Sequence, residues 1–349
     1  MLRALLLAAA LLTVPAFDAA ARSGLHAPYP SSSLIAGITW HANTYASGGP
    51  GGDIWASTSG ADGSVYAAWG DGTIGCRRKV SYGVAALPAV PRADPHTVGC
   101  GPPGVGHGKI ISLLDVHGTL DAVVLDREAS WPYSPVEIWG SGDHGRTWRR
   151  PGWSFTGGDL RPQTFVTFGP GYGGSRDGFV YLTALRATKP LTRVYLARAP
   201  EEGELGHQAA YQYLAGTDAN GVPRWTDRPD GASAIFTDPN GVDGPQIAYD
   251  PGVGRYLLTI AHGHDGADGG RIGIFEAREP WGPWGTVQYE DSWFGIRGGT
   301  YLGISFPSRW LADGGRTLWA VFSCYGARSC GRYHDKLNIM QATLTLRGR

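Results

Sequence analysis

The sequence has little charge and no excess of either sign. Of its 349 residues only 17% are charged, and 30 Lys and Arg balance 30 Asp and Glu. Proteins that are drawn to nucleic acid or to an anionic membrane surface by their overall field carry a clear basic excess. The composition therefore argues against both partners.

Beyond its first residues, the chain also lacks helical periodicity and long apolar runs. A membrane-spanning helix needs roughly 20 consecutive apolar residues, and no segment after residue 21 provides them, so no membrane span is predicted. Instead there are 54 Gly, 24 Pro and 13 Trp residues. Turn formers and aromatics at this density are typical of many short strands, which predicts an all-β protein.

The N-terminus has the layout of a secretory signal peptide. Arg3 supplies a positive charge, residues 4–14 are apolar, Pro15 ends the run, and residues 19–21 are three alanines. The alternative, a membrane anchor, needs a longer apolar run. We therefore expect a signal peptide over residues 1–21, a linker over 22–33 and one domain over 34–349. The mature protein would be a soluble, extracellular or periplasmic monomer.

Cysteine is scarce: Cys76, Cys100, Cys324 and Cys330 are the four in the chain. An even number in an oxidising compartment favours two disulfides. Proximity in the sequence predicts Cys76–Cys100 and Cys324–Cys330, although four cysteines allow three pairings. A zinc site is the alternative, but no Cys-x-x-Cys pair or His cluster accompanies them. We predict no metal and no cofactor, and leave a structural Ca²⁺ ion open.

A pattern of strand, glycine turn and strand recurs five times. Its glycines are 55 to 76 residues apart: Gly63, Gly118, Gly178, Gly254 and Gly315. A tight hairpin requires a residue that tolerates positive φ. Five repeats predict a five-bladed β-propeller, whereas a β-sandwich or jelly roll would not need them. A last strand over 337–346 can close the ring with the strand at 34–40.

A turn motif agrees with this fold. Residues 141–148 read Ser-Gly-Asp-His-Gly-Arg-Thr-Trp and match the Asp box, S-x-D-x-G-x-T-W. Its Asp and Gly build a turn, under which its Trp packs. The box is typical of propellers and lies away from the channel, so we interpret it as structural.

The repeat also predicts which residues share a rim. Because the first two strands of a blade are antiparallel, the start of one and the end of the other lie together. The first-strand starts are Asp53, Lys109, Gln163, Gln246 and Tyr301, and the second-strand ends are Asp71, Asp126, Arg186, His262 and Ser323. A polar mouth with Trp55 and other tryptophans nearby suits a sugar-binding cleft.

Asp53 and Asp71 are the strongest candidates for catalytic residues within this set. They are 18 residues apart, at the same end of one hairpin. Glycoside hydrolysis uses two carboxyl groups, one protonated and one ionised, and proximity separates their pKa values. The alternative is that both are turn formers. Glu276 is a third candidate carboxylate, or else a solvated turn charge. No G-x-S-x-G, P-loop or H-E-x-x-H motif is present.

Several segments together resemble a known family. They are IAGITW at 35–40, GDIW at 52–55, VYAAWGDG at 65–72 and GIFEAREPWGPW at 273–284. The series, spanning 34–346, resembles a family of secreted bacterial domains long labelled as of unknown function, some of which are endo-D-arabinanases. The resemblance implies a five-bladed propeller whose acidic site corresponds to Asp53 and Asp71. Residues 53–56 read Asp-Ile-Trp-Ala where family members read Asp-Asn-Trp-Pro.

Three functions follow as hypotheses. The first is a secreted glycoside hydrolase acting on a polysaccharide, with D-arabinan-type cell-wall glycan favoured by the resemblance. Asp53 and Asp71 would be catalytic, with Glu276 in reserve. The substrate-binding residues would be Trp55, Lys109, Asp126, Gln163, Arg186, Gln246, His262 and Tyr301. The second is a non-catalytic carbohydrate-binding propeller at the cell surface, and the third is a protein-interaction scaffold.

Overall fold

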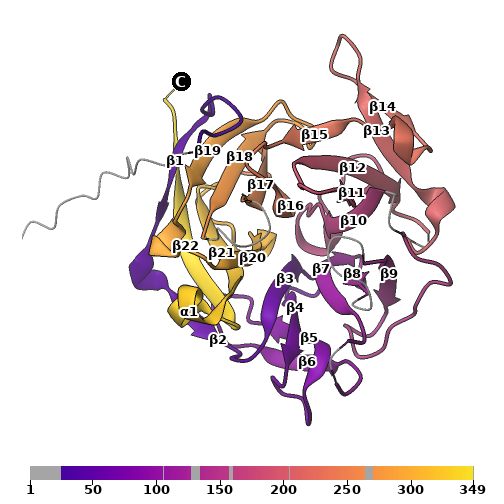
Figure 1. The fold of residues 1–349 in the computed structure, drawn as a ribbon, viewed down its shortest axis with the longest axis vertical. Coiled ribbons are helices and arrows are strands. Elements are labelled where there is room, and N and C mark those ends of the chain that lie inside the picture. The colour runs from indigo at the N-terminus through magenta and orange to yellow at the C-terminus, as the bar shows by residue number, and fades with distance from the viewer. Residues whose placement is uncertain are drawn as a thin grey trace, which may run out of the picture.

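Five β-sheets form a ring around a common centre (Figure 1). This computed structural model describes residues 25–104, 106–126, 134–156, 160–203, 205–263 and 270–348. The expected signal peptide, residues 1–21, lies outside the described residues. The predicted five-bladed β-propeller is confirmed.

Each sheet is one blade, and its strands follow one another outward from the centre. Blade 1 contains β3 (Asp53–Ser59), β4 (Val65–Gly72), β5 (Val80–Leu87) and β6 (His96–Cys100). Blade 2 contains β7 (Lys109–Val116), β8 (Thr119–Leu125) and β9 (Val136–Ser141). Blade 3 contains β10 (Leu160–Phe165), β11 (Phe179–Arg186), β12 (Arg193–Pro200), β13 (Gln212–Thr217), β14 (Pro223–Thr226) and β15 (Ala234–Thr237). Blade 4 contains β16 (Asp243–Asp250), β17 (Arg255–Ala261), β18 (Ile272–Ala277) and β19 (Gly285–Glu290).

Blade 5 joins the two ends of the chain. It contains β20 (Thr300–Ser305), β21 (Thr317–Tyr325) and β22 (Leu337–Leu346), together with β1 (Ile35–Trp40) and β2 (Ala46–Gly48). Strand β1 pairs antiparallel with β22, with Ile38 opposite Leu344, and β2 extends the same edge. The ring is therefore closed by hydrogen bonds between the N-terminal and C-terminal strands.

Helices are short in the described part of the chain. Helix α1 spans Ala327–Cys330. Single 3₁₀ turns occur at Ala42–Thr44, Pro170–Tyr172, Gln208–Ala210, Pro229–Gly231, Trp293–Gly295, Ser308–Trp310 and Gly331–Tyr333. No helix of the described residues is long and apolar enough to cross a membrane.

The core lies between the blades, because each sheet is covered on both faces by its neighbours. Strand β4 illustrates this with Ala67 and Ala68, which are buried on opposite faces. Their small side chains let adjacent sheets approach closely. One apolar cluster between blades 1 and 2 combines Tyr66 and Val84 with Ile110 and Leu120. This packing fixes β3 beside β7 and so positions the inner strand ends.

The hairpin glycines behave as the repeat predicts. All five have positive φ, namely 87° at Gly63, 89° at Gly118, 72° at Gly178, 68° at Gly254 and 82° at Gly315. In the register that follows, Asp53 lies opposite Gly70 and Lys109 opposite Leu125. The starts of β3 and β7 and the ends of β4 and β8 therefore lie at the ends remote from the hairpin turns.

Two disulfides and the N-terminal segment brace the ring. The bonds are Cys76–Cys100 in blade 1 and Cys324–Cys330, which joins the end of β21 to α1, as predicted. The described part of the segment expected as a linker contacts blades 3 and 4, because the Tyr29 ring centroid is 5.0 Å from that of Phe236 on β15 and 6.0 Å from that of Phe275 on β18. Thr286 also donates a backbone hydrogen bond to Pro30.

The segment that matches an Asp box forms a compact turn after β9. Asp143 accepts hydrogen bonds at Oδ1 from the Ser141 hydroxyl and the Thr147 N–H, both 2.8 Å. The Thr147 hydroxyl, which donates to Oδ2 at 2.7 Å, has the largest effect, and with the other two donors it lowers the pKa of Asp143 to about 2. Trp148 lies beside Trp139, with ring centroids 6.3 Å apart.

Candidate active site

Asp53, Asp71 and Lys109 meet at one end of the inner strands. Lys109 Nζ lies 2.7 Å from Asp53 Oδ2 and 2.9 Å from Asp71 Oδ2. Their side chains are 11%, 23% and 11% exposed for Lys109, Asp71 and Asp53 respectively. The structure thus brings together two carboxylates and one cation that the repeat had assigned to the same rim.

Local backbone geometry makes room for this cluster. A Cβ at Gly70 would lie 2.3 Å from Lys109 Cε and 2.7 Å from Asp53 Oδ1, so only glycine fits between them. Ile54, Trp55 and Asp71 have φ values of 72°, 60° and 55°. Non-glycine residues in this region store about 1–3 kcal/mol of strain each, and such residues concentrate at functional sites.

The surroundings of Asp53 raise its pKa. Burial raises the pKa of Asp53; the charge and hydrogen bond of Lys109 oppose this, and the charges of Asp71 and Asp335 add to it. Asp53 Oδ1 is buried and has no hydrogen-bond partner among the described residues. With both carboxylates ionised, the group of three would carry one net negative charge. A single proton on Asp53 makes it neutral, and burial favours the neutral state.

Asp335 is an acidic neighbour that sequence reasoning missed. It lies in the connection between β21 and β22, outside the repeat, with φ of 42°. Its carbonyl accepts hydrogen bonds from the N–H groups of Gly51 and Gly52, 2.8 and 3.3 Å away. Its own N–H donates to Cys324 O at 3.1 Å. The backbone of Asp335 therefore joins the loop that leads into Asp53 to Cys324, which is disulfide-bonded to Cys330.

Three other predicted residues are buried in the protein interior. Trp55 is fully buried and its indole N–H donates to Gly52 O at 2.9 Å. Tyr301 is also buried and donates to Trp293 O at 2.8 Å. Gln163 is buried, and its amide donates to Pro162 O at 3.1 Å. The hydrogen bonds of all three thus go to backbone carbonyls and not to the carboxylates.

Gln246 lines the narrow centre of the ring. It borders a cavity of about 20 Å³ together with Ser57 and Ser305, whose hydroxyls are hydrogen-bonded at 2.7 Å. The central channel is therefore too tight at this level to hold a sugar.

The remaining predicted rim residues have separate environments. Asp126, partly exposed, donates its N–H to Pro135 O at 2.9 Å. Arg186 donates to Pro229 O at 2.8 Å and stacks over Tyr195. His262 stacks on Tyr289 with ring centroids 3.9 Å apart, and burial lowers its pKa to about 4.

Glu276 lies on β18, the third strand of blade 4. Its carboxylate accepts a hydrogen bond from Ser32 Oγ at 2.6 Å and pairs with Arg255 Nε at 2.8 Å. One oxygen thus holds the N-terminal segment against the blade, and the other forms an ion pair with the neighbouring strand β17. The structure does not place Glu276 in the cluster of Asp53, Asp71 and Lys109.

No group of three His, Cys, Asp or Glu side chains able to hold a metal ion occurs among the residues that the structure describes. The side chains around Asp53 supply two carboxylates and a cation, which suit proton transfer and nucleophilic attack at a neutral substrate.

Comparison with known proteins finds structures with a similar fold but no similar sequence. No protein-family model and no curated protein sequence matches the chain. A crystal structure of a GH43_1 enzyme from Xanthomonas citri is similar over 88% of this chain and 95% of its own, with 13% identity and a TM-score of 0.51. The same enzyme has been solved in complex with xylotriose. An exo-β-1,3-galactanase described as putative, from Bifidobacterium bifidum s17, is similar over 85% of this chain and 90% of its own, with 10% identity and a TM-score of 0.50. At these identities the likeness shows a shared propeller fold.

Proposed function

We propose that this chain is an exported glycoside hydrolase that cleaves a polysaccharide with Asp53 and Asp71. The observation that carries the proposal is the contact of both carboxylates with one ammonium, that of Lys109. A pair of carboxyl groups held this close, in a partly buried site, is the arrangement that glycosidic cleavage requires. Export is supported by the signal-peptide pattern and by the two disulfides.

The roles of the two carboxyl groups follow from their surroundings. Asp53 is the more buried and has a raised pKa, which suits a general acid that protonates the leaving oxygen as the glycosidic C–O bond breaks. Asp71 is the more exposed and stays paired with Lys109, which suits the ionised partner. Asp71 then attacks the anomeric carbon or takes a proton from the attacking water.

D-arabinan-type cell-wall glycan is the favoured substrate. The support is the sequence resemblance to the family that includes endo-D-arabinanases. The two solved structures named above belong to enzymes whose names or bound ligands concern other sugars, xylose and galactose. A shared fold does not carry specificity, so the substrate panel in the test includes xylan and galactan.

One observation favours a second candidate, a non-catalytic carbohydrate-binding propeller. Lys109 occupies the position between the two carboxylates and pairs with both. If this ion cluster persists when a sugar binds, the carboxylates hold hydroxyl groups and transfer no proton. This candidate predicts binding without turnover.

The experiment is incubation of the mature protein with D-arabinan, L-arabinan, xylan and galactan, followed by chromatography of released oligosaccharides. We expect one of these polymers to be cut, and Asp53→Asn and Asp71→Asn each to lower the rate by about 10²–10⁴-fold. The matched control is Asp94→Asn, at an exposed aspartate between β5 and β6. Full activity in both variants, with unchanged circular dichroism, overturns the proposal, and binding without any released product supports the second candidate.

A further inference from the structure

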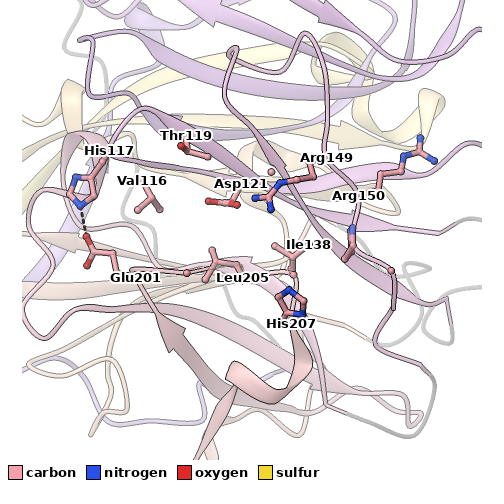
Figure 2. Close-up of a pocket in the computed structure, with 15 residues that line it drawn as sticks. Val116, His117, Thr119, Asp121, Ile138, Arg149, Arg150, Glu201, Leu205 and His207 are labelled. Atoms are coloured by element: carbon pink, nitrogen blue, oxygen red, sulfur yellow. Dashed lines mark hydrogen bonds and ion pairs between the residues drawn. The ribbon is translucent and has the colours of Figure 1, made fainter.

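A second cavity lies between blades 2 and 3, apart from the aspartate pair (Figure 2). Its volume is about 370 Å³. One wall comes from β8, β9 and residues 149–152, and the facing wall comes from residues 201, 203 and 205–207, between β12 and β13. Cavities of this order are within the range of small-molecule sites, about 300–1,000 Å³. None of the functional hypotheses drawn from the sequence accounts for it.

Three residues that pair side by side across neighbouring strands form the floor of this cavity. Asp121 on β8 lies opposite Gly140 on β9, and Gly140 in turn forms a bridge with Arg149. Gly140 and Arg149 exchange two backbone hydrogen bonds, 3.0 and 2.7 Å long. A carboxylate and a guanidinium therefore flank a residue without a side chain, and all three border the cavity.

Gly140 keeps the space between the two charged groups open. A Cβ at this position would lie 3.4 Å from Arg149 Nη2 and 3.5 Å from Asp121 Oδ1. The opening above Gly140 is thus bordered by a hydrogen-bond donor on one side and an acceptor on the other. Gly140 does not have positive φ, so a larger residue can be placed here without backbone strain.

A contact between the two blades borders one part of the cavity. His117 Nε2, in the turn between β7 and β8, lies 2.6 Å from Glu201 Oε1 after β12, and Leu205 supplies an apolar surface on the facing wall. Figure 2 shows Asp121 and Arg149 pointing toward the middle of the cavity and Leu205 below them. Burial raises the pKa of Asp121 to about 7, so a neutral ligand can leave this carboxyl group protonated or ionised without a large penalty.

Charge balance narrows the chemical class of ligand. Asp121 and Glu201 disfavour an anion, and Arg149 disfavours a free cation, because each like-charge contact in a partly buried site costs free energy. Adjacent hydroxyl groups of a sugar offer a donor to a carboxylate and an acceptor to a guanidinium at the same time. A neutral polyol is the class that satisfies both sides of Gly140.

We propose that the cavity between blades 2 and 3 is an accessory sugar-binding site that holds a mono- or disaccharide unit across Asp121 and Arg149. Two neighbouring hydroxyls bridge the carboxylate and the guanidinium above Gly140, and Leu205 contacts the C–H face of the ring. This site does not depend on the aspartate pair being catalytic.

The test uses the mature protein carrying Asp53→Asn, so that turnover does not consume the ligand. Calorimetric titrations with D-arabinose, D-xylose, D-galactose and xylobiose identify which of these sugars binds. Gly140→Leu, which fills the opening, is expected to weaken binding at least about tenfold, since a site built for hydroxyl groups loses them together. Gly152→Ala is the matched control, because it lines the same cavity and its Cβ would meet nothing within 4 Å.

A second variant separates loss of binding from loss of folding. Asp121→Asn preserves the shape of the floor and removes the carboxylate, and it too is expected to weaken binding while Gly152→Ala stays within about twofold. The proposal is overturned if no sugar of the panel binds the Asp53→Asn protein. It is equally overturned if a sugar binds and both Gly140→Leu and Asp121→Asn leave its affinity unchanged. Hydrolysis by protein with Asp53 intact is scored separately, so failure of the catalytic proposal is recognised independently.

Discussion

The Lys109 ammonium lies 2.7 Å from Asp53 Oδ2, and this ion pair joins the first strands of two adjacent blades. The same ammonium reaches Asp71 on the second strand of blade 1. Each carboxylate is therefore held by a cation that the neighbouring blade supplies. The charge of Lys109 therefore affects both the free energy of unfolding and the pKa of Asp53.

Replacing Lys109 by Met leaves two facing carboxylates without their cation. Removing one partner of a buried ion pair costs about 3–5 kcal/mol, and we expect about 3 kcal/mol at pH 7 because the site is partly exposed. The loss depends on pH. Without the ammonium, the folded-state pKa values of the carboxyl groups rise, so stability is retained below pH 4 and is lost as the pH rises through these raised values. Urea denaturation between pH 4 and 8 measures this.

The control for Lys109→Met is Lys79→Met, at an exposed lysine before β5. We expect it to change the free energy of unfolding by less than about 0.5 kcal/mol at any pH. A loss in Lys109→Met that is the same at pH 4 and pH 8 would show that packing of the lysine stem, and not its charge, stabilises the site.

The spacing of the carboxylates predicts the stereochemical outcome. Because Lys109 Nζ lies 2.7 Å from one Oδ2 and 2.9 Å from the other, the two oxygens are at most about 5.6 Å apart. Retaining glycosidases hold their carboxyl groups about 5–5.5 Å apart, and inverting enzymes hold them about 6.5–9.5 Å apart. We expect retention, with Asp71 as the nucleophile. Hydrolysis in the presence of methanol should yield methyl glycosides of the substrate's own anomeric configuration, and their absence would point to inversion.

Counting along the repeat predicted the blades and the rim but not the face on which each side chain lies. The hairpin glycines fix the register, and register brings Asp53, Asp71 and Lys109 to one end of the strands. Successive side chains on a strand point to opposite faces, and so Tyr301, also at a strand start, is buried beside Trp293. The carbonyl of Asp335 accepts hydrogen bonds from Gly51 and Gly52 next to the site. Asp335 lies outside the repeat, so the repeat could not predict this contact.

Asp335→Asn tests whether the charge of this residue tunes Asp53. The negative charge of Asp335 raises the pKa of Asp53, so its removal lowers that pKa. If Asp53 is the general acid, the alkaline limb of the kcat/KM profile moves to lower pH, because the acid loses its proton sooner. The backbone hydrogen bonds of residue 335 remain in this variant. A uniform fall in activity, with the alkaline limb unmoved and Asp94→Asn unaffected, would assign Asp335 a structural role only.

His262 gives a pH dependence of stability with the opposite sign to Lys109→Met. Its ring stacks on Tyr289 and lies near Arg271; burial first, and then the Arg271 charge, lower its pKa to about 4. An unfolded histidine titrates near 6.5. Protons therefore bind the unfolded chain more tightly, and stability falls as the pH drops from about 6.5 toward 4, by about 3 kcal/mol in total from this residue.

We expect His262→Gln to lose this part of the acid sensitivity, whereas His96→Gln, at an exposed histidine on β6, should retain it. Urea denaturation of the wild type and both variants at pH 7 and pH 4.5 gives the loss of unfolding free energy between the two pH values. An equal loss in all three proteins would contradict the prediction, because it would show that protonation of His262 does not destabilise the fold.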